Sequence, residues 1–414
     1  MTSRPNIRFE GYTDDWEQRK LGEVTTLKSA SRVHREEWKE SGVPFYRSSD
    51  VMSAINGTEN EKAFISEELY EKLSSVSGKL EEGDVLVTGG GSVGNPYIVP
   101  DNKPLYTKDA DLLWIKNQGR FDAYFIYEFF FSPTFRSYLG SVSHVGTIAH
   151  YTITQLSETP VALPSLEEQK KIGDYFKSLD NLITLHQRKC DETKELKKYM
   201  LQKMFPKNGE KRPEIRFEGF NDDWEQRKLS ECAGFRRGSF PQPYGNKEWY
   251  DGEGAMPFVQ VADVADDMKL VDDTKQKISK VAQPMSVYAD KGSVLVTLQG
   301  SIGRVAITQY GAFVDRTVLI FDKYNQDIDK TFWAYIIKEK FIDEARKAPG
   351  GTIKTITKEA LSDFDLMLPN YDEQKKLGAF LVSIDNLITL YQRKCDELKE
   401  VKKFMLQNMF PGRD

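Results

Sequence analysis

The chain carries at residues 163–206 the stretch LPSLEEQKKIGDYFKSLDNLITLHQRKCDETKELKKYMLQKMFP, and residues 368–411 repeat it as LPNYDEQKKLGAFLVSIDNLITLYQRKCDELKEVKKFMLQNMFP. The two copies agree at 30 of 44 positions. A shorter pair accompanies them, because residues 5–21 (PNIRFEGYTDDWEQRKL) match residues 213–229 at 14 of 17 positions. Units of this size are whole domains rather than small stacked repeats, so the sequence predicts two similar halves in one chain.

The repeated segments divide the chain into four predicted parts. They are a first variable domain at 1–162, a constant helix at 163–206, a second variable domain at 207–367 and a second constant helix at 368–414. Each variable domain begins with a constant leader, at 5–21 and at 213–229.

The two variable domains echo each other only weakly. GDVLVTGGGSVG at 83–94 corresponds to GSVLVTLQGSIG at 292–303, and both read as a β-branched strand that ends in a glycine turn. Aromatic helices are expected at 121–131 and 330–345. This mixture of short strands and helices predicts an α+β fold for each variable domain.

The two constant segments have the pattern of long helices. Apolar residues recur at alternating steps of three and four, which is a heptad seam. Prolines mark where each helix begins and ends. About forty residues at ~1.5 Å each predict helices of roughly 60 Å, and we expect them to pair as an intramolecular coiled coil. The predicted seam consists of Ile172, Leu179, Ile183, Cys190, Leu196, Met200, Leu377, Ile384, Ile388, Cys395, Val401 and Met405. Two independent core helices are the alternative, which would not explain seams that stay apolar throughout.

Composition limits the class of protein. The chain has 414 residues, of which 39% are hydrophobic and 29% charged, as in ordinary soluble proteins. No apolar run is long enough for a membrane span, and the first residues lack a signal-peptide pattern. Three cysteines fit reduced thiols in a cytosol, so a cytoplasmic protein is expected. The net charge of −5 disfavours a general polyanion binder.

Two enzyme motifs are matched only superficially. Residues 89–94 satisfy G-x-G-x-x-G, but NPYIVP follows and cannot begin the helix that a pyrophosphate site needs. Residues 95–97 (NPY) lack one proline of the Asn-Pro-Pro-Tyr box of amino-group DNA methyltransferases, and the second half has RVA there. Neither a dinucleotide site nor a methyltransferase is predicted.

Histidine and cysteine also argue against catalysis. All four histidines lie in the first half, at positions 34, 144, 150 and 186, so an activity shared by both halves cannot depend on them. His34, His144 and His150 remain open as polar contacts or surface residues. Cys190 and Cys395 occupy equivalent seam positions and suit a core role. The sequence predicts no catalytic residue and no metal site.

The whole arrangement resembles the specificity subunit of type I restriction–modification systems. The resemblance rests on the alternating variable and constant blocks, the LP…EQKK helix starts, the MLQ-MFP helix ends and the VLVT-G-S-G segments. It covers essentially the whole chain, although no single motif is specific. It implies a non-catalytic subunit whose two variable domains each recognise one half of a split, asymmetric DNA target. It also implies that the constant helices pack antiparallel with pseudo-two-fold symmetry and set the gap between the half-sites.

The resemblance also implies partners. These are double-stranded DNA, two methyltransferase subunits held by the constant segments, and restriction–translocase subunits in the full complex. S-adenosylmethionine, ATP and Mg²⁺ are expected on the partner subunits and not on this chain. The alternative function is a coiled-coil scaffold with two protein-binding domains and no DNA readout, which only the resemblance disfavours.

The charge of the variable domains predicts local DNA contacts. Residues 22–162 hold 13 Lys and Arg against 19 Asp and Glu, and residues 230–367 hold 18 against 20, for net charges of −6 and −2. We therefore expect partner subunits to supply much of the phosphate contact, and the isolated chain to bind DNA weakly and with strong salt dependence.

The predicted base contacts lie after the Pro-Phe strands, in the segments 44–51 and 257–264, at the glycine turns and in the loops before each constant helix, while basic residues elsewhere are predicted to contact phosphate. Arginine and lysine suit guanine or phosphate, and glutamine suits adenine. For each candidate a structural role in its turn stays open. The candidates are Lys28, Arg32, Arg35, Arg47, Ser48, Ser49, Gly91, Ser92, Thr147 and Tyr151 in the first domain, and Arg236, Arg237, Gln260, Gln299, Ser301, Arg304, Arg316, Thr352 and Lys354 in the second.

The leaders look like domain anchors. Trp16 and Leu21, with their counterparts Trp224 and Leu229, are expected to be buried. The charged leader residues could contact the constant helices or a methyltransferase. Because the leader is duplicated, duplicated docking of one kind of partner is expected.

Overall fold

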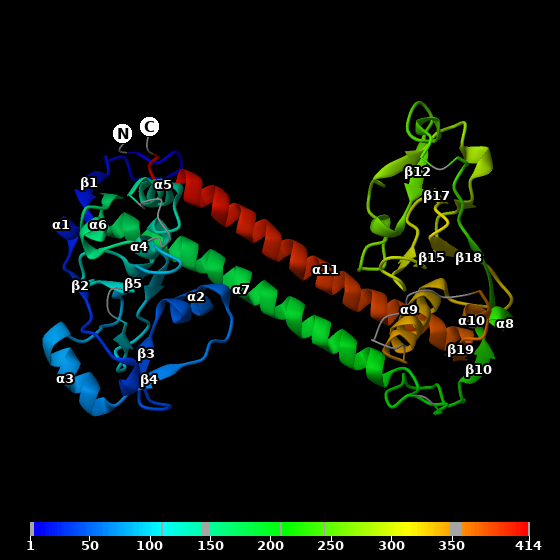
Figure 1. Ribbon diagram of the computed structural model, residues 1–414, viewed down its shortest axis with the longest axis horizontal. Helices are drawn as coiled ribbons and strands as arrows, with labels where there is room; N and C mark the ends of the chain where they lie inside the picture. The colour runs from blue at the N-terminus through cyan, green and yellow to red at the C-terminus, as the bar shows by residue number, and fades with distance from the viewer. Residues whose placement is uncertain are drawn as a thin grey trace. The chain divides into compact units, whose positions relative to one another are not determined.

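The computed structural model describes residues 4–108, 111–142, 150–207, 209–243, 245–347 and 358–412. The chain forms two compact units (Figure 1). The first unit comprises Met1–Gln187 and Arg393–Asp414, and the second comprises Arg188–Gln392. Each long helix therefore contributes one part to each unit.

The first unit contains nine short strands and six short helices before the first long helix, within the described residues. They are β1 (Glu17–Lys20), α1 (Leu21–Val24), β2 (Leu27–Ser29), η1 (Arg35–Glu37), β3 (Val43–Tyr46), α2 (Ser48–Asn56), β4 (Ala63–Ile65), α3 (Glu67–Ser77), β5 (Val85–Thr88), β6 (Pro96–Ile98), β7 (Tyr106–Thr107), β8 (Leu112–Ile115), α4 (Ala123–Phe129), α5 (Pro133–Val142), α6 (Ile153–Ser157) and β9 (Pro160–Leu163), with η1 a 3₁₀ turn.

The second unit follows the same plan with different details. Its elements are β10 (Glu225–Lys228), α8 (Leu229–Cys232), β11 (Ala233–Arg237), η2 (Lys247–Trp249), β12 (Met256–Val259), η3 (Val261–Asp263), β13 (Gln276–Ile278), η4 (Gln283–Met285), β14 (Tyr288–Ala289), β15 (Val294–Thr297), β16 (Val305–Ile307), β17 (Ala312–Val314), β18 (Val318–Tyr324), α9 (Lys330–Lys347), α10 (Lys358–Ser362) and β19 (Asp365–Leu368).

Each unit is built on a four-stranded antiparallel sheet. The strand order is β2-β8-β5-β6 in the first unit and β11-β18-β15-β16 in the second. The two VLVT segments form β5 and β15, inside their sheets, and every residue of both strands is buried. A second sheet accompanies each, three-stranded β4-β3-β7 in the first unit and four-stranded β13-β12-β17-β14 in the second. The predicted α+β fold of the variable domains is confirmed.

The leaders anchor each unit. β1 pairs antiparallel with β9, and β10 pairs with β19, so each leader strand lies beside the strand that precedes a long helix. Trp16 and Trp224 are 2% and 1% exposed, and Leu21 and Leu229 are fully buried, as expected. Aromatic side chains surround Trp16, including Phe125 of α4 with ring centroids 5.7 Å apart.

The LP…EQ segment fixes the start of each long helix to its variable domain. Gln169 donates from Nε2 to the carbonyl oxygen of Pro164 at 3.0 Å and accepts from the backbone N–H of Asp122 at 3.1 Å. Gln374 makes the same two bonds, to Pro369 and from Asp329, at the same distances. The constant motif is therefore a structural joint.

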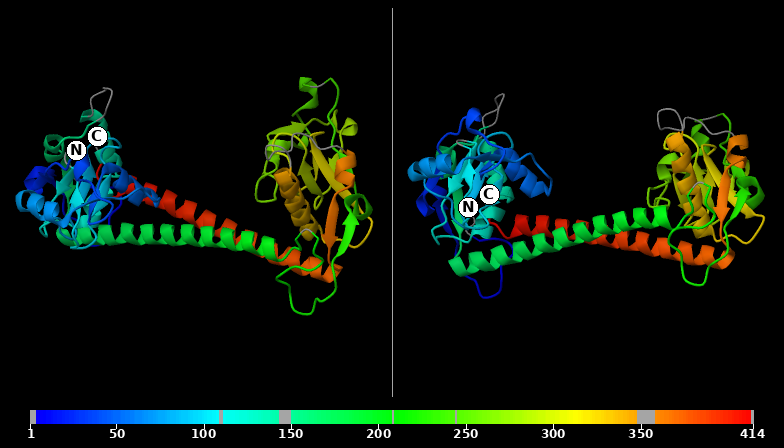
Figure 2. Two further views of the ribbon diagram at one scale, coloured as in Figure 1. Left: turned by 60° about the horizontal axis from the view of Figure 1, so that its bottom comes forward. Right: turned by 90° about the horizontal axis from the view of Figure 1, so that it is seen from below.

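The two long helices are α7 (Leu166–Lys203) and α11 (Tyr371–Asn408), each of 38 residues. At ~1.5 Å per residue each is about 57 Å long. They pack antiparallel and lie side by side in both units (Figures 1 and 2). No helix among the described residues is long and apolar enough to cross a membrane.

The contacts between the helices are the same in both units, with the roles of the helices exchanged. In the first unit the thiol of Cys395 lies 3.9 Å from the carbonyl oxygen of Ile183. In the second unit the thiol of Cys190 lies 3.9 Å from the carbonyl oxygen of Ile388. The antiparallel pairing implied by the resemblance is confirmed.

The seam differs from the predicted one at one position in each helix. Leu196 and Val401 are 44% and 43% exposed, so neither lies in the seam. Their neighbours Lys197 and Lys402 turn inward instead and are only 18% and 17% exposed. A straight helix with 3.6 residues per turn drifts away from a strict heptad pattern, which brings the next position inward. Of the other predicted seam residues, six are buried (Ile172, Leu179, Cys190, Leu377, Ile384 and Cys395) and four are half-buried (Ile183, Met200, Ile388 and Met405).

This placement predicts unequal costs for two leucine substitutions in α7. Leu179→Ala should lower the free energy of unfolding by about 2–5 kcal/mol, because it opens a cavity in a packed core. Leu196→Ala should change it by about 0.5 kcal/mol or less, as at exposed sites. Urea denaturation of both variants measures the difference, and equal costs would contradict the corrected seam.

Candidate nucleic-acid interface

The glycine turn after β5 presents a small polar surface in the first unit. Thr88 holds the turn closed, since its hydroxyl donates to the carbonyl oxygen of Ser92 and accepts from the N–H of Asn95. Gly91 has a φ of +71°, and a Cβ built at this position would meet nothing within 4 Å. Gly91 and Ser92 are exposed. The turn can therefore approach a flat partner closely.

Two further segments meet this turn. The hydroxyl of Ser48, at the start of α2, donates to the carbonyl oxygen of Asp111 at 3.1 Å, and the N–H of Gly89 donates to the same oxygen at 2.8 Å. The N–H of Tyr151 donates to Gly89, and His150 forms a bridge with Gly90. The structure thus gathers the exposed Ser49, the turn and His150 at one end of the sheet.

The second unit repeats this scaffold with other side chains. Thr297 donates to the carbonyl oxygen of Ser301 and accepts from the N–H of Arg304. A Cβ at Gly300 would lie 3.6 Å from Val261, the residue after Gln260. The N–H of Leu298 donates at 2.8 Å to Thr317, the residue after Arg316. Gln260, Gln299, Ser301 and Arg316 are therefore brought together.

Asn95 and Arg136 support the first turn, and sequence reasoning missed both. Asn95 donates to the carbonyl oxygen of Ser92 at 2.8 Å and accepts from Nη2 of Arg136 at 3.0 Å. Arg136 lies over the rings of Phe131 and Phe135, and burial lowers its pKa. No spacing in the sequence connects these residues, because they come from a turn and a helix about forty positions apart.

Several predicted basic residues are engaged inside their own unit. Lys28 donates to the carbonyl oxygen of Ser77 at 2.9 Å. Arg47 pairs with Asp50 at 2.9 Å and lies over the ring of Trp38. In the second unit Arg236 pairs with Asp322, and Arg304 pairs with Asp266 at 3.0 Å. Such residues reach DNA only by giving up a protein contact.

Other predicted residues are more available. Arg32 and Arg35 are exposed and have no ion pair within the described ranges. Arg316 is exposed and rests on the ring of Phe240, with 4.6 Å from its guanidinium carbon to the ring centroid. Gln299 and Ser301 are exposed, Gln260 is half-buried, and Arg237 lies exposed at the end of β11.

Tyr151 is not a surface residue. It is 1% exposed, and its hydroxyl bonds to Thr159 inside the core. Burial raises its pKa, so the phenol stays neutral. Its backbone, rather than its side chain, supports the turn. Thr147, Thr352 and Lys354 lie outside the described residues.

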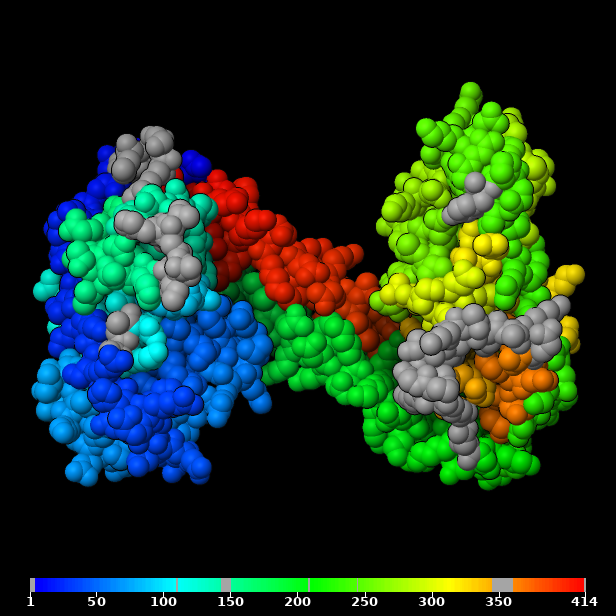
Figure 3. Space-filling model, viewed as in Figure 1, coloured from blue at the N-terminus to red at the C-terminus, as the bar shows by residue number. Residues whose placement is uncertain are grey.

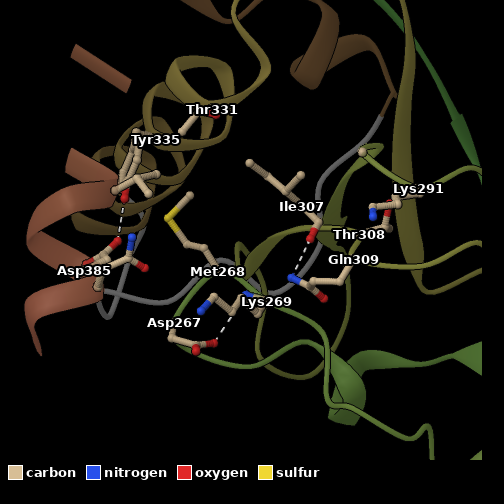
Figure 4. Close-up of a pocket in the computed structure, with 13 residues that line it drawn as sticks. Asp267, Met268, Lys269, Lys291, Ile307, Thr308, Gln309, Thr331, Tyr335 and Asp385 are labelled. Atoms are coloured by element: carbon tan, nitrogen blue, oxygen red, sulfur yellow. Dashed lines mark hydrogen bonds between the residues drawn. The ribbon is translucent and has the colours of Figure 1, made fainter. Parts of the chain in front are cut away.

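A pocket of about 420 Å³ lies in the second unit, away from the turn (Figure 4). Its lining includes Thr331 and Tyr335 of α9 and Asp385 of α11. Tyr335 points at Asp385 and donates a hydrogen bond to it. Within the described residues no group of three His, Cys, Asp or Glu side chains could hold a metal ion.

Comparison with known proteins decides the family. Residues 13–195 and 221–400 each match the family described as "Type I restriction modification DNA specificity domain". The chain belongs to this family. Its two matches coincide with the two repeats, and together they cover most of the sequence. The resemblance stated from the sequence is confirmed.

The similarity to individual specificity subunits is moderate. The chain is 24% identical over 370 residues to the type I restriction enzyme MjaVIII specificity subunit of Methanocaldococcus jannaschii, covering 83% of this chain and 82% of that protein. It is 25% identical over 265 residues to the MjaX specificity subunit of the same organism. That match covers 63% of this chain and about 60% of the relative's length.

Solved structures show the same fold. The S subunit of a type I restriction–modification system from M. genitalium aligns over 99% of this chain and 100% of its own, with a TM-score of 0.63 and 15% identity. A chain from a structure of type I system assembly aligns over 94% of this chain and 96% of its own, with a TM-score of 0.53 and 19% identity. These similarities establish the specificity-subunit fold.

Proposed function

We propose that this chain is the non-catalytic subunit that directs a type I restriction–modification complex to a bipartite, asymmetric DNA target. One observation carries the proposal: two units of the family share a turn scaffold but differ at its exposed tips. Gly90 stands where the second unit has the exposed Gln299, beside a Gly-Ser pair that both turns share, and the adjoining segments differ as Arg47–Ser48 against Gln260–Val261. Two units with one scaffold and different tips suit a DNA site whose halves differ.

The residues at these tips are the proposed base contacts. A side-chain amide can pair with two edge atoms of adenine, and at the turn of the second unit Gln299 and Gln260 carry such amides. Arg32, Arg35 and Arg316 are exposed cations suited to phosphate, where contacts position the protein and do not specify sequence.

The two long helices carry equivalent exposed surfaces, from which we also propose the partners. Exposed apolar side chains recur at equivalent places on the two helices: Leu182 and Leu387 are both 43% exposed, and Tyr199 and Phe404 are 49% and 54% exposed. Part of each helix surface is open to solvent (Figure 3). Two equivalent surfaces suit two copies of one methyltransferase subunit. Restriction–translocase subunits would complete the complex, and S-adenosylmethionine, ATP and Mg²⁺ would bind to the partners.

Co-expression with the matching methyltransferase tests the proposal. The complex should co-purify, and sequencing of the methylated host DNA should show one split motif with two different halves. If the chain were a scaffold without DNA readout, no such motif would depend on its presence.

Gln299→Ala should alter one half of that motif. Loss of a bidentate base contact costs about 1–3 kcal/mol of discrimination, so one base position should relax by roughly ten- to a hundredfold. The methylation map reads this directly. Gln326→Ala is the matched control, because Gln326 is exposed in the loop beyond the far end of β18. An unchanged motif in Gln299→Ala would remove Gln299 from the proposed contacts.

A further inference from the structure

Glu128 forms a buried charge cluster with two partners in the first unit. It lies on α4 and its side chain is fully buried. One carboxylate oxygen, Oε1, accepts from Nζ of Lys402 of α11 at 2.7 Å, and the same Nζ donates to both oxygens of Asp180 of α7 at 2.7 and 2.8 Å. The other oxygen, Oε2, is buried and has no hydrogen-bond partner in the part of the chain that the structure describes. Two carboxyl groups thus face one ammonium group.

We propose that Glu128 holds a proton at neutral pH, and that this proton keeps α4 attached to the two long helices. Its release weakens the joint between the first variable domain and the helices. The corresponding joint of the second unit does not depend on a proton. This inference concerns attachment of the domains and does not depend on DNA reading.

The surroundings of Glu128 favour the neutral carboxyl. The pKa of Glu128 is raised to about 8, with burial as the largest cause; the charge of Lys402 opposes the rise and the charge of Asp180 adds to it. Tyr124 and Tyr127 of the same helix also lie nearby, and burial raises the pKa of both, so both phenols stay neutral and add no charge. A second buried negative charge beside one lysine would stay uncompensated.

The second unit shows the same joint without the extra carboxyl. Asp122 caps the start of α4, and Asp329 caps the start of α9 in the same way. Glu128 and Tyr335 each come six residues after the capping aspartate, so Tyr335 is the counterpart of Glu128. Tyr335 donates to Asp385 (Figure 4). Nζ of Lys197 lies 2.6 Å from Asp385. The positive charge of Lys197 balances the negative charge of Asp385, and the phenol of Tyr335 is neutral, so this cluster needs no additional proton.

The sign of the pH effect follows from linkage. The pKa of Glu128 is raised from 4.5 in the unfolded chain to about 8 in the folded chain. Between these values the folded chain binds one more proton than the unfolded chain, so its stability falls as the pH rises. The contribution is fully present below pH 4.5 and lost by about pH 8.

Carboxyl NMR of the full chain measures the proton directly. With ¹³C-labelled glutamate carboxyl groups, one resonance should titrate near pH 8 and be absent from Glu128→Gln. If every glutamate titrates at its ordinary pKa of about 4.3, the proposal is wrong.

Thermal unfolding measures the consequence. Glutamine imitates the protonated carboxyl, so Glu128→Gln should match the native Tm at low pH and exceed it increasingly as the pH rises to about 8. Tyr335→Phe is the control at the sister joint, and its difference from the native chain should not vary with pH. Glu128→Tyr, which installs the second unit's side chain, is the second variant and should show the same pH-dependent gain. Differences that stay constant with pH in both Glu128 variants would overturn the proposal.

Discussion

Arg8→Ala is expected to lower the free energy of unfolding by about 3–5 kcal/mol, the usual cost of removing one partner from a buried ion pair. Arg8 donates from Nε and Nη2 to the two oxygens of Glu168, at 2.6 and 2.8 Å. The side chain of Glu168 is fully buried at the start of α7, and that of Arg8 is only 14% exposed. The substitution would leave the carboxylate without its partner. The hydrogen bond with Glu168 also raises the pKa of Arg8.

Arginines beside the first leader and within the second offer matched controls for this measurement. Arg4 pairs with Asp15, but both side chains are more than 60% exposed, so Arg4→Ala should cost about 1 kcal/mol or less. Arg216 pairs with the buried Glu373 at 2.7 Å and should behave like Arg8. Urea denaturation followed by tryptophan fluorescence compares the three variants. If Arg8→Ala lowered the free energy of unfolding no more than Arg4→Ala does, the ion pair between Arg8 and Glu168 would not stabilise the attachment of α7 to the leader.

Lengthening both long helices by one heptad is expected to abolish methylation at the native target and create a target with a longer gap. The insertions go between residues 187 and 188 and between 392 and 393, because these positions face each other in the antiparallel pair. Seven residues preserve the apolar pattern and add roughly 10 Å, which corresponds to at most about three base pairs.

The methylation map of the lengthened chain separates the roles of helix and domain. Both half-sites should keep their sequences, since the variable domains are unchanged. An insertion in only one helix is the control, and it should disrupt the pairing and yield an inactive complex. Altered half-sites after the paired insertion would show that the helices take part in reading the bases.

Local patterns predicted the architecture well. The heptad spacing, the prolines and the repeats are properties of contiguous sequence, and they were enough to indicate two helices and two α+β domains. Leu196 and Val401 were misplaced because the sequence does not show how far a straight helix drifts from heptad geometry over several turns. The next residue in each helix, Lys197 or Lys402, turns inward instead. Lys197 pairs with Asp385, and Lys402 pairs with Asp180, in each case across to the other helix.

The candidate interface was harder to predict, because its chemistry depends on contacts between distant segments. Lys28 and Arg47 look like free cations in the sequence, but Ser77 and Asp50 engage them in the fold. Tyr151 looked like a loop residue and is part of the core. The glycine turns were recognisable because glycine and short polar residues mark them locally.

Exchange of residues 230–364 for the corresponding block of another specificity subunit tests most directly whether each variable domain reads its own half-site. Methylated sites should then change in one half of the motif only, to the sequence read by the donor block, while the other half and the gap stay the same. If the exchange changed both halves, or left the motif as it was in an active complex, separate reading by the two domains would be contradicted.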